Sequence, residues 1–320
     1  MNVHDLLEIE DATGIVAEEY WAKKGEVDLY LIRKFLPSAR AAHPDRPVLF
    51  LVHGSSFSAR TSYDLAMPGH GEYSLMNTFA RLGYDVWTMD HEGYGRSSRT
   101  EGFSYISDGV DDLQAAMLIV EESTGASSFA FFGSSSGALR AGAFANAAPD
   151  RVGRLAMAAL VWTGEGSPTL IKRAKRIDEW RATNRRLADE ATYEGIFSRD
   201  ITGLTIPELA KVAAAAEIEN GGGSVPNGTY IDMCVNLPVV DPTAITCPVL
   251  IFRGDHDGIA TDEDGFGFYS ALATTDKQSV MVSGQAHNTS LGINRHRFWQ
   301  VLHGFLSMPP RLDDDDGAGE

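Results

Sequence analysis

A serine stands at the centre of the most informative short motif in this sequence. Ser135 has a glycine two residues away on each side, Gly133 and Gly137, and so matches the pattern G-x-S-x-G. A predicted strand precedes the motif and a predicted helix follows it, which is the context that a nucleophilic serine on a sharp turn requires. Of the three consecutive serines here, only Ser135 has both flanking glycines. The motif therefore predicts Ser135 as a nucleophile on a strained backbone that projects its hydroxyl into a site.

A histidine late in the chain can serve this serine as its base. His287 follows a predicted buried strand and lies in a loop of glycine, serine and asparagine residues, which sets it apart among the nine histidines. A base in the loop after the last strand can reach a nucleophile at the end of an earlier strand. We therefore expect His287 to take the proton of Ser135.

Such a histidine needs a carboxylate to fix its tautomer and to stabilise its charged form. Asp255 and Asp257 both follow a predicted strand. Asp257 is the first choice, because the spacing Gly254-x-x-Asp257 lets the loop turn back towards the base, and Asp255 is the alternative acid. Glu165, at the end of an earlier strand, is a third choice. His256 is interpreted as a loop residue, because adjacent positions in a chain rarely converge on one metal ion.

Acyl transfer also needs two N–H donors for the oxyanion that forms during the reaction. The first predicted donor is the backbone N–H of Ser136, directly after the nucleophile. The second should come from the loop after the first central strand, where Ser55 is the first candidate and Ser56 the second. His53 precedes them, and we expect it to orient this loop through packing and hydrogen bonds rather than to act as a catalyst.

The wider pattern, alternating strands and helices, would position these residues. An early antiparallel strand is predicted over residues 26–36, and further strands over 47–52, 84–89, 128–132, 155–162, 248–252 and 279–282. Helical apolar spacing predicts helices over 107–122, beginning at Ser107 or Asp108, and over 137–148 and 295–306. Buried strands that alternate with helices predict an α/β fold with a mostly parallel central sheet and helices on both faces.

The pattern changes in the middle of the chain. Between residues 163 and 241 helical periodicity dominates, strand signals are few, and glycines interrupt the stretch at 221–223. We interpret it as a helical cap inserted over the carboxyl edge of the sheet, where open α/β sheets bind ligands. The predicted core has two parts, residues 1–162 and 242–310, and the predicted cap is residues 163–241. Residues 311–320, which include Asp313–Asp316, are predicted to form an acidic flexible tail.

Composition excludes several classes of protein. Hydrophobic residues make up 43% of the chain, as in globular proteins, and the formal net charge of −17 disfavours nucleic acid as a partner. The sequence shows neither an apolar run long enough for a bilayer nor a secretory signal, so we expect a cytoplasmic protein with no membrane partner. The two cysteines, Cys234 and Cys247, lack CxxC spacing. We expect neither a disulfide framework nor a metal nor a cofactor; the oligomeric state stays open.

Further motifs follow one order along residues 47–300. His53-Gly54 comes after the first central strand, and residues 90–97 (DHEGYGRS) match the pattern D-x-x-G-x-G-x-S. The serine motif, the acid loop and His287 complete the order. In these features the chain resembles the α/β-hydrolase superfamily, in its capped, serine esterase-like branch. The run from Gly54 to Gly69 is also similar to that of bacterial hydrolases of phthalate monoesters.

This resemblance implies a serine hydrolase that cleaves a carboxylic ester of a small molecule without a cofactor. Haloalkane dehalogenases and epoxide hydrolases of this superfamily carry Asp at the nucleophile position, so Ser135 excludes their chemistries. Hydrolysis of a lactone, thioester, amide or carbon–carbon bond by the same triad is the alternative. A non-catalytic binding module on the same fold is a further one, which the completeness of the triad disfavours.

The first part of the predicted cap is rich in cations. Ile171, Ala174, Ile177 and Trp180 recur at helical spacing and predict one apolar face. Seven cations surround them, namely Lys172, Arg173, Lys175, Arg176, Arg181, Arg185 and Arg186. They form either a solvated basic face or, through one or two arginines at the pocket mouth, a site for an anionic substrate such as a monoester with a free carboxylate.

Overall fold

One sheet carries the core. In the computed structural model, which describes residues 3–312, eight strands lie in the order β1-β2-β4-β3-β5-β6-β9-β10. The first two strands form an antiparallel hairpin, β2 is antiparallel to β4, and the neighbours from β4 to β10 are parallel. Their bounds are Val16–Lys24 (β1), Val27–Phe35 (β2), Val48–Val52 (β3), Asp85–Met89 (β4), Phe129–Ser134 (β5), Val152–Ala158 (β6), Val249–Gly254 (β9) and Lys277–Val282 (β10).

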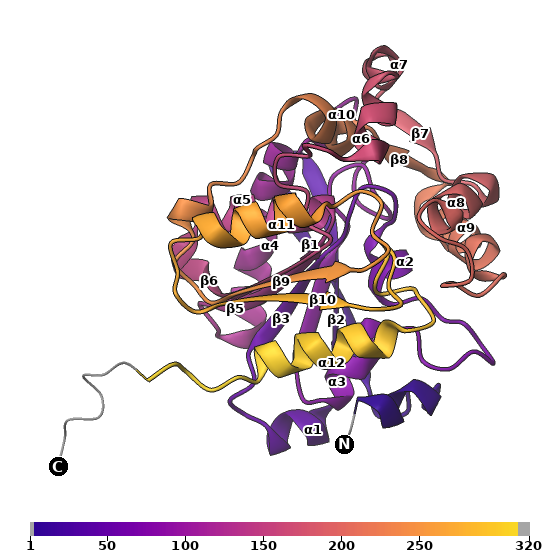
Figure 1. The fold of residues 1–320 in the computed structure, drawn as a ribbon. Helices are drawn as coiled ribbons and strands as arrows, with labels where there is room; N and C mark the ends of the chain where they lie inside the picture. The colour runs from indigo at the N-terminus through magenta and orange to yellow at the C-terminus, as the bar shows by residue number, and fades with distance from the viewer. Residues whose placement is uncertain (1–2, 313–320) are drawn as a thin grey trace.

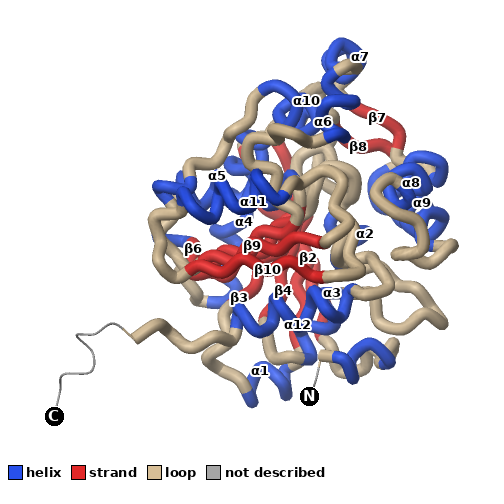
Figure 2. The backbone as a smooth tube through the Cα atoms, in the orientation of Figure 1, coloured by secondary structure: helices blue, strands red, loops and turns tan. Residues whose placement is uncertain are grey.

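Helices cover both faces of this sheet, as Figures 1 and 2 show. The longer helices on one face are α4 (Ile106–Thr124), α5 (Ser136–Ala147) and α11 (Asp262–Ala271). On the other face lie α3 (Leu75–Arg81) and α12 (Arg295–Leu306). The short elements are η1 (His4–Glu8), α1 (Pro37–Ala42), α2 (Ala59–Tyr63), η2 (Pro149–Arg151) and η3 (Pro242–Ala244). The predicted α/β-hydrolase architecture is thereby confirmed.

Burial explains why the central strands form. Every residue of β3 and of β4 is buried; β3 is apolar throughout, and β4 is apolar except for Asp85 and Thr88. Two hydrophobic clusters result, one between the sheet and α4 and α5, the other between the sheet and α3 and α12. Such a core holds the carboxyl ends of the parallel strands in fixed register. In that register Gly133 of β5 pairs with Val52 of β3 and with Met157 of β6.

The sequence misses several elements at the periphery. Strand β1 was not predicted, and its exposed and covered residues alternate because it lies at the edge of the sheet. The N-cap of helix α4 is Tyr105, two or three residues before the expected Ser107 or Asp108, and the Asp108 side chain accepts from the Tyr105 N–H. The predicted helix over 295–306 is confirmed to the residue.

The stretch 163–241, called here the inserted segment, joins β6 to η3. In Figure 1 its elements lie above and beside the carboxyl ends of β9 and β10. It holds five short helices and a two-stranded ribbon of β7 and β8 in the described chain. The bounds are Pro168–Ala174 (α6), Ile177–Ala182 (α7), Arg185–Leu187 (β7), Glu190–Ser198 (α8), Leu209–Gly221 (α9), Ser224–Pro226 (β8) and Gly228–Val235 (α10).

The expected continuous helical face at the start of the inserted segment is wrong. The chain leaves the helix at Lys175 and Arg176, so that α6 and α7 are separate. The Trp180 indole N–H turns back to the carbonyl of Arg173, at 3.3 Å, instead of continuing an apolar stripe. The predicted acidic residues Asp313–Asp316 lie outside the described part of the chain.

Candidate active site

Ser135 sits on a strained turn between β5 and α5. Its φ of 57° places a non-glycine residue in the left-handed region, which costs about 1–3 kcal/mol and persists at functional sites. The flanking glycines are needed for close approach. A Cβ on Gly133 would lie 2.3 Å from the carbonyl oxygen of Gly137, and one on Gly137 would lie 2.1 Å from that of Val52. The turn thus holds the serine hydroxyl at the carboxyl end of β5.

The structure brings three of the predicted residues into one hydrogen-bonded chain. His287 Nε2 lies 2.9 Å from Ser135 Oγ, and His287 Nδ1 lies 2.8 Å from Asp257 Oδ1. Because a carboxylate only accepts, Nδ1 carries the proton and the unprotonated Nε2 accepts from the serine hydroxyl. His287 is therefore oriented as a base towards Ser135.

Asp257 is held as a carboxylate behind the histidine. Burial opposes its charge, but His287 and the backbone N–H groups of Ile259 and Ala260 favour it, so that the pKa of Asp257 is lowered. The two N–H groups donate to Oδ1 at 2.8 and 3.0 Å. A fixed negative charge at this point stabilises the imidazolium that forms when His287 takes a proton.

The other acids lie elsewhere. Asp255 Oδ1 accepts from the N–H groups of Gly284 and Gln285, at 2.9 and 3.2 Å. These hydrogen bonds attach the start of the histidine loop to the core. Glu165 is exposed, and its backbone N–H donates to Thr163 Oγ1. His256 is partly exposed beside Asp255. Only Asp257 among the predicted acids contacts the histidine ring within residues 3–312.

The loop after β3 lies against the nucleophile turn. His53 is buried; its Nδ1 donates to the carbonyl of Gly54 at 2.9 Å and its Nε2 accepts from the His91 N–H at 3.2 Å. Burial lowers the pKa of His53 well below its usual value, so the ring is neutral and its tautomer is fixed. Because a trans peptide directs its C=O and N–H to opposite sides, the Ser55 N–H points away from His53.

Ser55 is also tied to its neighbours on both sides. Its hydroxyl lies 2.7 Å from that of Ser136, which joins the two predicted oxyanion segments. Its carbonyl accepts from Tyr94 Oη, at 3.1 Å, and from the Arg186 guanidinium. Across the described chain no acceptor is paired with the backbone N–H of Ser55, Ser56 or Ser136. The assignment of these three N–H groups to an oxyanion stays a prediction.

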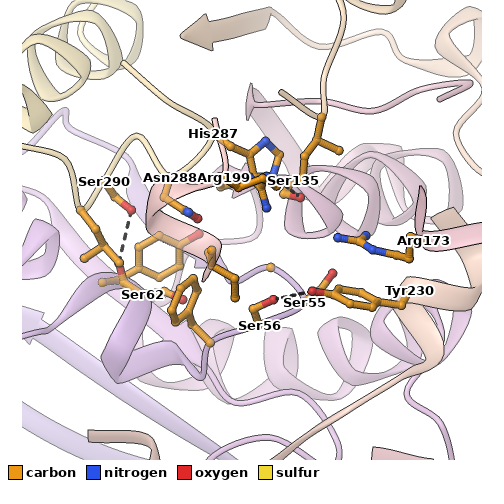
Figure 3. Close-up of a pocket in the computed structure, with 17 residues that line it drawn as sticks. Ser55, Ser56, Ser62, Ser135, Arg173, Arg199, Tyr230, His287, Asn288 and Ser290 are labelled. Atoms are coloured by element: carbon orange, nitrogen blue, oxygen red, sulfur yellow. Dashed lines mark hydrogen bonds between the residues drawn. The ribbon is translucent and has the colours of Figure 1, made fainter. Parts of the chain in front are cut away.

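A cavity of about 50 Å³ opens over Ser135 (Figure 3). By the space that a water requires, this is room for roughly four waters. Its polar lining comes from Ser55, Ser56, Ser62, Ser134, Ser135, His287, Asn288, Ser290, Arg173, Arg199 and Tyr230. Its apolar lining comes from Phe57, Tyr63, Ile196, Ile259 and Leu291. The core thus supplies the reacting groups, and the inserted segment closes the cavity with two arginines and a tyrosine.

Arg173, on α6, is the cation in this cavity that lacks an acidic partner. In Figure 3 its guanidinium extends towards Ser135 with Tyr230 beneath it, and it stacks 3.6 Å from the centre of that ring. No carboxylate in the described chain pairs with it. Burial lowers the pKa of Arg173, and the charges of Arg186 and Arg199 lower it further, against the opposing effect of Tyr230.

Tyr230 is the partner that Arg173 has instead. Arg186 stacks on the same ring, also at 3.6 Å, and Ser56 Oγ lies 3.2 Å from the phenol oxygen. Burial would raise the pKa of Tyr230, but Arg173 and Arg186 lower it to about 7. A tyrosine that ionises this easily reports a strongly positive environment.

The other six predicted cations are either on the surface or bound to backbone carbonyls. Lys172, Lys175 and Arg181 are exposed, and Arg176 pairs with Glu179 on the surface at 2.7 Å. The remaining two bind backbone carbonyls: Arg185 donates to Gly93, and Arg186 donates to Ser55 and Pro226. Of the seven, Arg173 alone lines the cavity over Ser135.

Three residues of this site were missed by sequence reasoning. Tyr230 and Arg199 line the cavity, and Asp200 accepts a hydrogen bond from the backbone N–H of His287 at 3.0 Å. They belong to no motif and are far from the triad in the chain. Only the cluster of cations at the start of the inserted segment pointed to this region.

Residues 3–312 hold no group of three or more His, Cys, Asp or Glu side chains that could bind a metal ion. In that same range no helix is long and apolar enough to span a membrane. The two cysteines are free thiols, and burial raises the pKa of Cys247 to about 11.

Residues 66–291 match the sequence profile of the serine aminopeptidase S33 family. No curated protein matches the chain in sequence. Among solved structures it is similar to a thermophilic esterase from Thermogutta terrifontis, with malate bound, at 17% identity and a TM-score of 0.62 over 90% of this chain and 98% of that one.

Two further similar structures are, by name, an enol-lactonase and a dienoate hydrolase. The enol-lactonase from Burkholderia xenovorans matches at 16% identity and a TM-score of 0.66, over 90% of this chain and 100% of that one. The 2-hydroxy-6-oxo-6-phenylhexa-2,4-dienoate hydrolase from Rhodococcus matches at 15% identity and a TM-score of 0.66, over 91% of this chain and 99% of that one. At these identities the likeness shows the fold.

Proposed function

Because the chain belongs to the serine aminopeptidase S33 family and is a hydrolase of the α/β-hydrolase fold, we propose that it cleaves a carboxylic ester of a small molecule through an acyl-enzyme on Ser135. The observation that carries this proposal is the hydrogen-bonded chain from Ser135 through His287 to Asp257 at the cavity. Nucleophile, base and acid each have a residue within hydrogen-bond distance of the next.

The chemistry follows from this geometry. Ser135 Oγ attacks the ester carbonyl while its proton passes to His287 Nε2, and the N–H groups of Ser136 and Ser55 donate hydrogen bonds to the oxyanion. The carbon–oxygen bond breaks as the imidazolium protonates the leaving alcohol. Water then attacks the acyl-enzyme by the same route, which releases the acid and restores Ser135.

The cavity supports a substrate that carries a negative charge. Arg173 is held near Ser135 without a carboxylate, and a guanidinium binds a carboxylate through paired hydrogen bonds. We therefore propose a half-ester, in which one carboxyl is esterified and another is free. A larger half-ester requires the side chains of the inserted segment to move, which fits a cap role for residues 163–241.

The same charges disfavour an aminopeptidase substrate. A free amino terminus is a cation, and Arg173, which has no carboxylate partner in the described chain, would repel it from the cavity. No aspartate or glutamate lines this cavity within the described residues. The family name therefore indicates the catalytic machinery, and the cavity of this chain indicates a different charge on the substrate.

A substrate panel tests the proposal. The panel contains a half-ester, its neutral diester, an amino-acid anilide, a lactone, a thioester and a carbon–carbon substrate, each assayed at low and high salt. We expect the highest kcat/KM for the half-ester, with a preference over the diester that weakens as salt rises. Faster cleavage of another class would replace the ester assignment. No turnover by the protein, together with tight half-ester binding, would favour a binding module.

A further inference from the structure

The inserted segment reaches into the catalytic machinery at Asp200. This residue follows α8, and its side chain is 2% exposed. Its Oδ2 accepts from the backbone N–H of His287 at 3.0 Å, and its Oδ1 accepts from Arg199 Nε at 2.7 Å. Figure 3 places Arg199 beside His287, on the cavity side. One buried carboxylate thus joins a cavity arginine to the backbone of the base.

The same carboxylate also packs against the loop of the acid. A Cβ on Gly258, the residue after Asp257, would lie 2.6 Å from Asp200 Oδ1. The carbonyl of Gly258 accepts from the Thr169 hydroxyl of α6 at 2.8 Å. Residues of the inserted segment therefore touch the acid loop at two points, and Asp200 contacts the acid loop and the base loop together.

The histidine loop also contacts the core, through the Gln285 carbonyl, which accepts from the His256 N–H at 3.0 Å, and through the His287 side chain. Asp255 holds its start through the N–H groups of Gly284 and Gln285. Beyond His287, the N–H of Ile293 donates to the carbonyl of Leu204, again in the inserted segment, at 2.9 Å. At His287 itself the partner of the backbone N–H is Asp200.

A buried carboxylate is costly unless it is paired and hydrogen-bonded. Asp200 meets that condition through Arg199 and the His287 N–H. Deleting the carboxylate would leave a backbone donor without its acceptor and Arg199 without its counter-charge. Both changes fall next to the 2.9 Å contact between His287 and Ser135.

We propose that Asp200 is a positioning residue: it sets the backbone of His287 against the acid loop, so that the inserted segment completes the catalytic geometry. This inference rests on the proposed serine hydrolase function. It makes the inserted segment part of the machinery that aligns the base, in addition to its part in lining the cavity. Displacing a catalytic group by about 1 Å can lower a rate about 100-fold.

Labelling of Ser135 by a fluorophosphonate tests this without a known substrate, because the probe needs an activated serine. Rates are compared for wild type, Asp200→Ala, Asp200→Asn and the matched surface control Asp178→Asn, whose side chain is exposed on α7. We expect Asp200→Ala to be labelled about 100-fold more slowly. Asp200→Asn keeps an oxygen acceptor and should lose about tenfold. The control should match wild type.

Steady-state kinetics and thermal unfolding separate positioning from a merely structural role. With an ester that is turned over, Asp200→Asn should lower kcat more than it changes KM, and its melting temperature should stay close to that of wild type. If Asp200→Ala does not fold, the isosteric Asn variant decides. Wild-type labelling rates in folded Asp200 variants would overturn the inference alone. An unlabelled wild-type protein would overturn both this inference and the proposed function.

Discussion

Charged side chains are paired differently in the catalytic loops of the core and on the cavity face of the inserted segment. In the core, Asp257 Oδ1 accepts from His287 and from two backbone N–H groups. On the inserted face, Arg173 has no acidic partner and shares a tyrosine ring with Arg186.

This contrast separates two tasks. The hydrogen-bonded triad is assembled without a ligand, so under the proposed function it can act on an ester carbonyl that reaches Ser135. An unsatisfied cation is stabilised when an anion enters, so it can select among substrates. Under the proposed function, the core determines the type of reaction and the inserted segment determines which substrate is preferred.

The largest expected effect comes from removing the nucleophile. Ser135→Ala should lower kcat by about 10⁴-fold or more, because the remaining groups cannot form the acyl-enzyme. Kinetics on a half-ester, with circular dichroism to confirm folding, measure this. Ser134→Ala should stay within a few fold of wild type. Ser136→Ala should fall between them, because it removes the 2.7 Å contact between its hydroxyl and that of Ser55.

The two neighbouring aspartates provide a sharper test of the core. Asp257→Asn should lower kcat by about 10⁴-fold, since an amide can hold the imidazole in the wrong tautomer. Asp255→Asn should cost about tenfold or less, because an amide oxygen can still accept from Gly284 and Gln285. Parallel kinetics on the two variants decide, and equal losses would contradict the distinction.

Much of this core could be predicted from the sequence because local constraints determine it. Strands β3 and β4 are buried on both faces, and the nucleophile turn needs glycines at fixed spacing. The edge strand β1 was not predicted because many of its side chains are exposed to solvent. The choice between Asp255 and Asp257 needed coordinates, since two residues of spacing decide which carboxylate faces the ring.

The inserted face was far less predictable. The break between α6 and α7 turns Arg173 into the cavity and leaves Arg176 on the surface. Sequence spacing alone treats these two arginines alike. Asp200 accepts from the backbone N–H of His287, and such contacts carry no residue-type signal. Long-range packing of the inserted segment, rather than local propensity, sets this half of the site.

Neutralising Arg173 should remove the preference for a half-ester and leave the catalytic step intact. Arg173→Met should lower kcat/KM for a half-ester by about 10- to 100-fold, the loss expected for a hydrogen-bonded charge pair worth about 1.5–3 kcal/mol. The neutral diester should be cleaved as by wild type or faster. Lys172→Met, on the exposed side of the same helix, is the matched control. A uniform loss on both substrates would assign Arg173 to structure alone.

The smallest effect concerns Tyr230 and pH. Its pKa of about 7 in the folded protein lies below the value of about 10 for an unfolded chain. Ionisation of Tyr230 therefore adds stability that grows from about pH 7 to pH 10 and is lost as the pH falls through 7. Urea unfolding across this range should show the gap between wild type and Tyr230→Phe widening with pH. A constant gap would contradict the positive environment inferred for the cavity.

In the proposed mechanism Ser135 carries the acyl group, and this intermediate can be trapped. Wild-type protein is mixed with excess activated aryl half-ester, quenched in acid during turnover and mapped by mass spectrometry. We predict an added mass equal to the acyl group on the peptide that contains Ser135, and none on that peptide in Ser135→Ala. If the half-ester is turned over with no adduct on Ser135, and turnover persists in the Ser135→Ala protein, Ser135 is not the nucleophile.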